Sequence, residues 1–416
     1  MTRFFDRYFF LALVVSTVPI LVLYNGLAGS HGNSLVTGIF IVSSTFAVAL
    51  FGRWRSFVPN VSDLAFAAYI GCIVVSFWLN GITDINETAL LVLSLAAYPA
   101  ARLFAGTGLK PTFVFVTLAI VAAGAAVTGF ELITQTDNSY GKPVIFGLYA
   151  AGGNFLISLG FAMIAVTCLE MSPRQRTLAG LLIIPAAAIF AASMVRLAFI
   201  AILVSLALGA YLSAPTMRRQ IATAILVTVV AMAIGLFVRS DKTIALATYA
   251  ANDFKAIIAS VAADNSGSEA IISPGERTLP SCSKSTNMDD SIDIRLGLLR
   301  DALQLVKSSG LFGIGLDGFM KRSCIRSHQV HNSFLQAAIE FGWLGGIALL
   351  ALVCLAGFYV LSLARFDQEA RFALCSLVFI IILTIGSGRT SRDGLLFLSL
   401  GFAAGLPNSA LSERGR

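Results

Sequence analysis

The residues best suited to chemistry lie near position 331, where His328 and His331 are followed by Asn332. An imidazole titrates near neutral pH, so a histidine held in a fixed place can act as a general base. The apolar stretch at 333–363 predicts a helix that enters a membrane, and His331 opens it. We therefore interpret His331 as a candidate base at a membrane interface, with the alternative that it only caps the helix.

Arginines suited to an anionic substrate occur at Arg196, Arg295, Arg389 and Arg392. The guanidinium group matches phosphate oxygens better than an ammonium does. Arg196 stands between two apolar runs, which favours a function, although it can also anchor the chain at lipid head groups. Arg295 can alternatively be a solvated residue of a charged helix. Arg389 and Arg392 can attract carrier phosphates or merely anionic lipid.

Four acidic residues near or within apolar runs have no assigned role from the sequence: Asp84, Glu87, Glu131 and Glu340. Glu340 can form structural hydrogen bonds or carry a proton. Asp84 and Glu87 can bind a hard cation, or they can simply belong to an acidic outer loop. No cysteine or histidine spacing is typical of a zinc site, so we expect no metal.

The composition requires a membrane to surround these residues. The chain has 416 residues, of which 57% are hydrophobic and 12% are charged, and its mean hydropathy is +0.84. Soluble domains contain about 25% charged residues, and disordered chains contain more. Both classes are excluded, which leaves an all-α polytopic membrane protein. Apolar runs predict about twelve transmembrane helices, centred on 8–28, 34–52, 63–82, 88–105, 112–134, 153–171, 177–194, 196–213, 220–238, 333–363, 370–387 and 394–408.

The loop charges predict an orientation. The net charge is +7, and in a membrane protein this favours cytoplasmic Lys and Arg over nucleic-acid binding. With twelve spans, the basic loops fall on one side, so both termini are expected in the cytoplasm. Three parts follow: helices one to nine at 1–238, a periplasmic loop domain at 239–332 and helices ten to twelve at 333–416.

The long loop is expected to contain helices, at 244–262 along the membrane surface and at 292–307. Its only cysteines are Cys282 and Cys324. Outside the cytoplasm they can form a disulfide, which would close about 40 residues and contribute on the order of 3–4 kcal/mol. The alternative is two free thiols.

The spacing around His331 resembles a known signature. His331-Asn332, nine residues, Gly342, two residues and Gly345 look like the His-Asn motif of the O-antigen ligase and O-antigen polymerase superfamily, which are bacterial membrane glycosyltransferases. The upstream segment 312–315, Phe-Gly-Ile-Gly, and the preceding Arg295 are also similar to that family. The segment 192–196, which ends in Arg196, is a partial match.

The resemblance implies a GT-C-like fold in the bacterial inner membrane, with the active site facing the periplasm. It implies transfer of a glycan from undecaprenyl diphosphate, without nucleotide sugar or metal cofactor, to a sugar hydroxyl on lipid A–core. His331, Arg196 and Arg295 are then the expected catalytic residues.

The remaining candidates have supporting roles in this interpretation. Asn332, His328, Arg389 and Arg392 are expected at the substrate, and small side chains at Gly342 and Gly345 allow close helix packing. Several alternatives stay open: an O-antigen or exopolysaccharide polymerase, a pilin-type protein oligosaccharyltransferase, a transporter of lipid-linked sugars, and a non-enzymatic scaffold.

Overall fold

A computed structural model describes residues 7–29, 34–50, 57–106, 109–135, 143–149, 151–193, 197–238, 240, 291–325 and 328–414. Over these residues the chain is helical and forms no β-sheet. The predicted surface helix at 244–262 lies outside the described residues. The predicted helix at 292–307 is present as α12 (Ser291–Ser308).

The other helices occur along the chain in the following order. They are α1 (Arg7–Val15), α2 (Thr17–Leu27), α3 (Ser34–Leu50), α4 (Val61–Asn80), α5 (Ile85–Phe104), α6 (Pro111–Thr134), α7 (Ala151–Cys168), α8 (Pro173–Ala192), α9 (Leu197–Leu212), α10 (Pro215–Val238), α13 (Gly318–Arg322), α14 (Ser333–Glu340), α15 (Gly342–Leu363), α16 (Gln368–Ser387), the 3-10 helix η2 (Thr390–Arg392) and α17 (Gly394–Arg414).

Each predicted apolar run coincides with one helix or with a pair of helices. Among the described residues, eight helices are long and apolar enough to cross a membrane, and the bent pair α1–α2 would make a ninth. The apolar parts of α3, α9 and α17 are shorter, at 38–50, 197–212 and 394–406. The all-α membrane class is therefore confirmed, while the number of twelve spans stays a prediction.

The first predicted span is bent because of a proline. The axes of 8–15 and 17–27 differ by 67°. Pro19 lacks a backbone N–H, and its ring would clash with the carbonyl of Val15, four residues earlier. The helix is therefore interrupted where α1 ends and α2 begins.

Side-chain caps position the turn between α4 and α5. Asn60 and Asp63 form a capping box at the start of α4, and Gly81 ends that helix with φ +75°. Asp84 then accepts hydrogen bonds from the backbone N–H groups of Asn86 and Glu87 at the start of α5. Each such cap contributes about 1 kcal/mol. This turn brings Glu87 to the end of the bundle that carries the candidate site.

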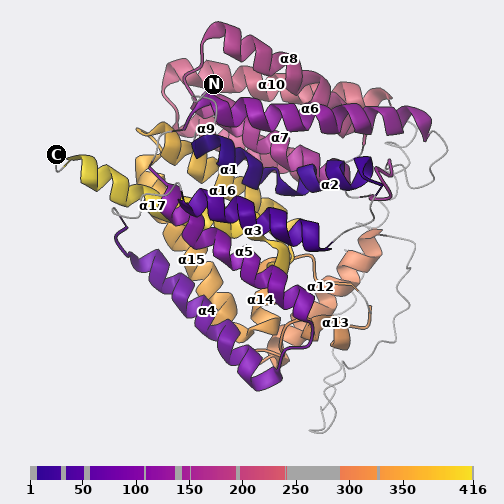
Figure 1. Ribbon diagram of the computed structural model, residues 1–416, viewed down its shortest axis with the longest axis vertical. Helices are drawn as coiled ribbons and strands as arrows, with labels where there is room; N and C mark the ends of the chain where they lie inside the picture. Colours follow the sequence, from indigo (N-terminus) through magenta and orange to yellow (C-terminus); the bar gives the residue numbers. More distant parts are fainter. Residues whose placement is uncertain are drawn as a thin grey trace, which may run out of the picture.

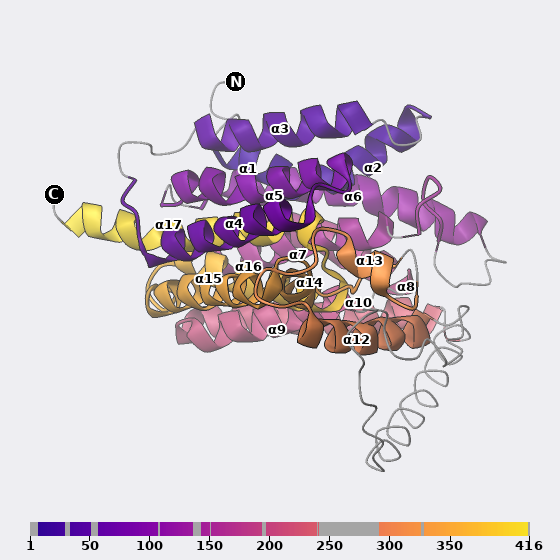
Figure 2. The ribbon, with the colours of Figure 1, turned by 90° about the horizontal axis from the view of Figure 1, so that it is seen from below.

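Two hydrophobic cores are present in the described part of the chain. The larger one joins the long helices, with α17 packed along α5 and α15 packed against α4. The smaller one consists of residues from α12, α13, α14 and their connections, including Leu298, Phe319 and Ile339. We call the segment 291–340 the cap. It gathers at one end of the bundle, beside α4, α5 and α15 (Figures 1 and 2).

Candidate functional site at the junction of the cap and the bundle

The apolar run 333–363 is not one helix, which corrects the sequence expectation. α14 begins at Ser333 and ends at Glu340, and α15 begins at Gly342. Gly342 has φ +81°, in the left-handed region that interrupts a helix. His331 lies outside the helix, and the predicted continuous stripe from His331 to Gly345 does not form.

The Phe-Gly-Ile-Gly segment packs against this break. The N–H of Ile314 donates to Ile339 O over 3.1 Å, and that of Gly315 donates to Glu340 O over 3.0 Å. A Cβ at Gly313 would collide with the backbone of Glu340, and one at Gly342 would collide with the carbonyl of Leu311. The backbones approach so closely because both positions are glycine.

The second glycine of the signature, Gly345, lies beside α4. A Cβ built on it would lie 2.8 Å from Phe341 Cβ in the preceding turn and 3.6 Å from Cys72 Cβ on α4, so the tight contact is local and the expected close helix packing stays a prediction. Glu340 O also accepts a hydrogen bond of 2.8 Å from Ser76 Oγ on the same helix. The break in 333–363 is thus fixed by the cap on one side and by α4 on the other.

His331 directly precedes Asn332, which is the N-cap residue of helix α14. The side chain of Asn332 accepts hydrogen bonds from the N–H groups of Phe334 and Leu335, each over 3.1 Å. Asn332 therefore caps the helix, and this interaction orients the residue before it. His331 is half-buried and has φ +56°, a conformation uncommon outside glycine.

The surroundings of His331 favour its neutral form. Burial lowers its pKa below the usual 6.5, and the positive charges of Arg295, His328 and Arg389 lower it further. Arg295, His328 and Arg389 are all candidates from the sequence, and their positive charges act on a further candidate, His331. At neutral pH the imidazole is mostly unprotonated, so it can accept a proton within a basic environment that suits an anion.

Arg295 reaches this environment from the exposed face of α12. The helix itself is fixed by the smaller core through Leu298, Ala302 and Leu305. The other predicted clamp residue, Arg196, lies outside the described residues. The chain becomes described again at Leu197, which packs against Gly386 near the end of α16.

Arg389 and Arg392 are both paired with an acidic residue of α5. Arg389 Nη2 lies 3.1 Å from Glu87 Oε2, and Arg392 Nη2 lies 2.6 Å from Glu87 Oε1. Ser391 Oγ donates to Glu87 Oε2 over 2.7 Å. Glu87 is buried, whereas the Arg392 side chain is 56% exposed. These pairs attach the turn before α17 to the start of α5.

Arg389 has a second carboxylate partner that the sequence analysis missed. Its Nη2 lies 3.3 Å from Oδ1 of Asp317, a buried residue with φ +60° at the start of α13. The same Oδ1 accepts a hydrogen bond of 2.9 Å from Gln329 Nε2. Asp317 follows the glycine-rich segment directly, and a non-glycine residue in the left-handed region cannot be recognised from its type alone.

Buried amides continue the network into α14. Gln336 Nε2 donates to Gln329 Oε1 over 3.3 Å and to Glu340 Oε2 over 3.0 Å. Glu340 is fully buried and lies before the candidate span 342–363. Burial and the nearby charge of Asp317 raise its pKa to about 8, so Glu340 is mostly uncharged at neutral pH. The structure shows it as an acceptor of the hydrogen bond from Gln336, and a role in proton transfer stays a prediction.

Asp393 connects the turn before α17 to the start of α14 through a hydrogen bond. It accepts a hydrogen bond from Ser333 Oγ, and burial raises its pKa to about 7. Thr390 Oγ1 donates to Ser333 O over 3.1 Å, and the Thr390 N–H donates to Gln336 Oε1 over 2.9 Å. The residues after His331 are therefore fixed from the bundle as well as from the cap.

The cap contains one of the two predicted disulfide cysteines. Cys324 is disulfide-bonded, and Cys282 lies outside the described residues, so their pairing stays a prediction. Asp301 on α12 accepts hydrogen bonds of 2.8 Å from Ser323 Oγ and from the Cys324 N–H. These bonds hold the chain before His331 against α12.

The acidic residues considered for a cation have other partners. Asp84 caps α5, and Glu87 pairs with arginines. Glu131 accepts a hydrogen bond of 2.6 Å from Gln135 Nε2. Within the described ranges, no group of three or more His, Cys, Asp or Glu side chains is arranged to hold a metal ion.

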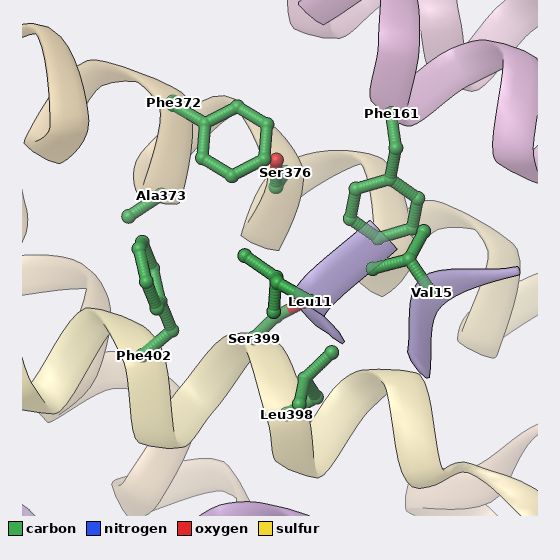
Figure 3. A pocket seen from close by; sticks show the side chains of 9 residues that line it. All are labelled: Leu11, Val15, Phe161, Phe372, Ala373, Ser376, Leu398, Ser399 and Phe402. Carbon is green, nitrogen blue, oxygen red and sulfur yellow. The ribbon is translucent and has the colours of Figure 1, made fainter. Parts of the chain in front are cut away.

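A small apolar pocket lies elsewhere, inside the bundle between α1, α7, α16 and α17. Figure 3 shows its lining side chains, with the rings of Phe161, Phe372 and Phe402 around the space. Ser376 and Ser399 supply its only hydroxyl groups. None of the charged residues near His331 lines it, so we assign no reaction to this pocket.

One comparison with known proteins is informative. Residues 179–350 match the family described as O-antigen ligase. The match extends from α8 into the first turns of α15 and includes the whole cap. A search of curated proteins found no match.

Proposed function

We propose that this chain, whose residues 179–350 match the O-antigen ligase family, is an O-antigen ligase of the bacterial inner membrane. It would transfer a glycan from undecaprenyl diphosphate to a sugar hydroxyl of lipid A–core at the periplasmic face. The observation that carries this proposal is His331, a half-buried histidine with a lowered pKa among three basic side chains.

In the proposed reaction, His331 takes the proton of the acceptor hydroxyl. The hydroxyl oxygen attacks the anomeric carbon of the glycan. The bond from that carbon to the diphosphate oxygen breaks, and its electron pair leaves with undecaprenyl diphosphate. A single displacement inverts the configuration at the anomeric carbon.

The arginines stabilise the charge that develops on the departing diphosphate, which is commonly the largest contribution in such transfers. Arg295 is the best-placed described residue, because it is exposed while its charge reaches His331. Arg196 is proposed as a second clamp residue on its family resemblance. Arg389 is engaged by Glu87 and Asp317, so its proposed contribution is a positive field more than direct contact.

The matched family is compatible with ligation and with polymerisation, and we propose ligation because the His-Asn, nine-residue, Gly spacing is complete. A polymerase would transfer the glycan to a second carrier-linked unit with the same donor chemistry. A transporter of lipid-linked sugars would be expected to have charges at the bilayer midplane. Here the charges near His331 gather at the junction of the cap and one end of the bundle.

The test compares cells that lack this gene with cells complemented by the native protein or by His331→Ala. Lipopolysaccharide is separated by gel, and carrier-linked glycan is measured in parallel. For a ligase, both deletion and His331→Ala remove long glycan from lipid A–core and leave full-length polymer on the carrier. Immunoblotting must show equal amounts of the two proteins.

Other outcomes would change the assignment. A single repeat unit on the core would mean a polymerase, and an unchanged pattern would direct attention to secreted polysaccharide, glycoproteins or transport. Full complementation by His331→Ala at normal protein level would contradict the proposed mechanism, in which His331 is the base.

We also propose that transfer needs no metal ion. The expected result is an unchanged transfer rate in membranes after treatment with EDTA. Loss of transfer that returns when Mg²⁺ or Mn²⁺ is added would contradict this part of the proposal.

A further inference from the structure

Glu87 occupies an unusual place for a buried carboxylate in a membrane protein. It lies in the first turn of α5, and its two oxygens together receive Arg389, Arg392 and Ser391, over 3.1, 2.6 and 2.7 Å. Ser94, two turns along α5, donates to Ser391 O over 3.0 Å. The turn that carries the arginines is therefore attached to α5 by ion pairs and hydrogen bonds.

Arg389 connects that turn to the cap. One Nη2 atom bridges Glu87 of the bundle and Asp317 of the cap, at 3.1 and 3.3 Å. A guanidinium with two carboxylate partners has little freedom to move. Two buried negative charges also offset part of its positive charge.

His331 is affected by this arrangement because the charge of Arg389 acts on it. The charges that act on it are those of Arg295 on α12, His328 in the preceding connection and Arg389 after α16. The turn that carries Arg389 lies at the start of α14, because Thr390 Oγ1 donates to Ser333 O over 3.1 Å. The elements packed around these also contain charged or titratable groups. They are Glu87 on α5, Arg300, Asp301 and Lys307 on α12, Asp317 before α13, Lys321 and Arg322 on α13, Glu340 on α14, Arg392 in η2 and Asp393 before α17.

We propose that Glu87 and Asp317 are positioning residues that hold Arg389 beside His331 and limit the positive field that it exerts on this base. The inference rests on the proposed function, in which His331 accepts the proton. Neither carboxylate is required to touch the substrate. Both act through Arg389, so their removal should alter the titration of the reaction and not only the amount of folded protein.

Glu87→Gln is the main test, because glutamine keeps the size and one accepting oxygen while it removes the charge and replaces the other oxygen by an N–H donor. The transfer rate is measured against pH in membranes, with extracted undecaprenyl-diphosphate-linked polymer as donor and lipid A–core as acceptor. The acidic limb of kcat/KM reports the base of the free enzyme. With less negative charge beside Arg389, the positive field at His331 increases and the pKa of His331 falls. The acidic limb should therefore move to lower pH by roughly half a unit.

Two further variants keep the test decisive if Glu87→Gln does not accumulate. Asp317→Asn removes the other carboxylate and should shift the limb in the same direction. Arg389→Gln removes the positive charge and should shift it to higher pH. Opposite shifts from opposite charges are not expected from a general loss of stability.

The matched control is Asp63→Asn. Asp63 also pairs with a buried arginine, Arg102 of α5, over 3.1 Å, but at the opposite end of that helix. Its removal should lower the thermal stability and the amount of protein, and should leave the acidic limb in place.

An acidic limb that stays in place, or moves upward, in Glu87→Gln or Asp317→Asn would overturn the inference. That result differs from failure of the proposed function. If His331→Ala keeps full transfer, the base itself is wrong. If His331→Ala is inactive while the limb of the carboxylate variants does not move, only the positioning role is wrong.

Discussion

At the scale of single residues, the charge around His331 determines the pH at which it can work. Its pKa is lowered by burial and by Arg295, His328 and Arg389, so the free base is already present at neutral pH. The midpoint of the acidic limb of transfer should therefore lie below pH 6.5, the unperturbed value of an imidazole. A rate-against-pH profile in membranes checks this, and a midpoint above 6.5 would contradict it.

Replacement of His331 by Gln should reduce transfer by about 10²- to 10⁴-fold, the usual contribution of a general base. His328→Gln provides the comparison, because it removes a neighbouring imidazole and leaves the proposed base. We expect a much smaller loss for His328→Gln. Equal losses in the two variants would indicate that the pair acts together or that both changes disturb the cap.

Arg295 offers a separate test because its side chain is exposed on α12. Arg295→Ala should leave protein amount unchanged and reduce kcat by about 10- to 100-fold through lost charge stabilisation. It should also raise the pKa of His331, since one lowering charge is removed, so the acidic limb moves to higher pH. Arg295→Lys should restore the position of the acidic limb more fully than it restores kcat. Lysine keeps the positive charge but lacks the two parallel N–H donors of the guanidinium group.

At the scale of elements, the break between α14 and α15 determines where the cap attaches. Gly342→Ala should destabilise the protein by at least about 2 kcal/mol, because φ is +81° and the new Cβ collides with Leu311 O. Gly357→Ala on α15 is the control, since a Cβ there meets nothing within 4 Å. Thermal unfolding in detergent should show a lower Tm only for Gly342→Ala.

The disulfide of the cap can be tested by counting thiols. Cys72, Cys168, Cys354 and Cys375 are free, and Cys324 is disulfide-bonded. If Cys324 pairs with Cys282, denatured and unreduced protein should react with four equivalents of maleimide, and Cys282→Ser protein should react with five. Four equivalents in Cys282→Ser would show that Cys324 has another partner.

At the scale of the whole molecule, the arginines divide between the two ends of the bundle. Arg102 and Arg371 are buried at the end away from the cap, where they bond to Asp63 and to carbonyls such as Ala364 O. These residues contribute to the orientation predicted from loop charges, although they are not free loop cations. Their burial in the folded protein does not alter the predicted orientation, because the positive-inside rule describes how Lys and Arg direct the insertion of the chain into the membrane.

The predicted orientation has a direct measurement. Green fluorescent protein fused after Arg416 should fluoresce, because it folds in the cytoplasm, and alkaline phosphatase fused after Thr83 should be active in the periplasm. The reverse pattern would place the cap in the cytoplasm, where a lipid-linked donor would have to be used on the opposite face.

Much of this protein follows from the sequence alone. Hydropathy is a local property, so the runs that became helices were recognisable, as was α12 from its amphipathic spacing. The signature drew attention to Gly342, whose φ of +81° favours glycine, and to Gly345, where a Cβ would lie 2.8 Å from Phe341 Cβ, while the role of His331 stays a prediction. The proximity of Arg295 and Arg389 to His331 was compatible with the sequence but was not specified by it.

Only the tertiary structure decided how these residues are held. Periodicity predicted one helix over 333–363, and the break was decided by backbone hydrogen bonds from the segment 310–315. From the sequence, Glu87 is an acidic residue of a loop, and only the packing of α5 shows its ion pair with Arg389, about 300 positions later in the chain. Asp317, Gln329 and Gln336 belong to no sequence motif that predicts their buried hydrogen bonds. Pairings between distant segments depend on how helices pack, and side chains of common polar types give no sign of them until packing excludes water.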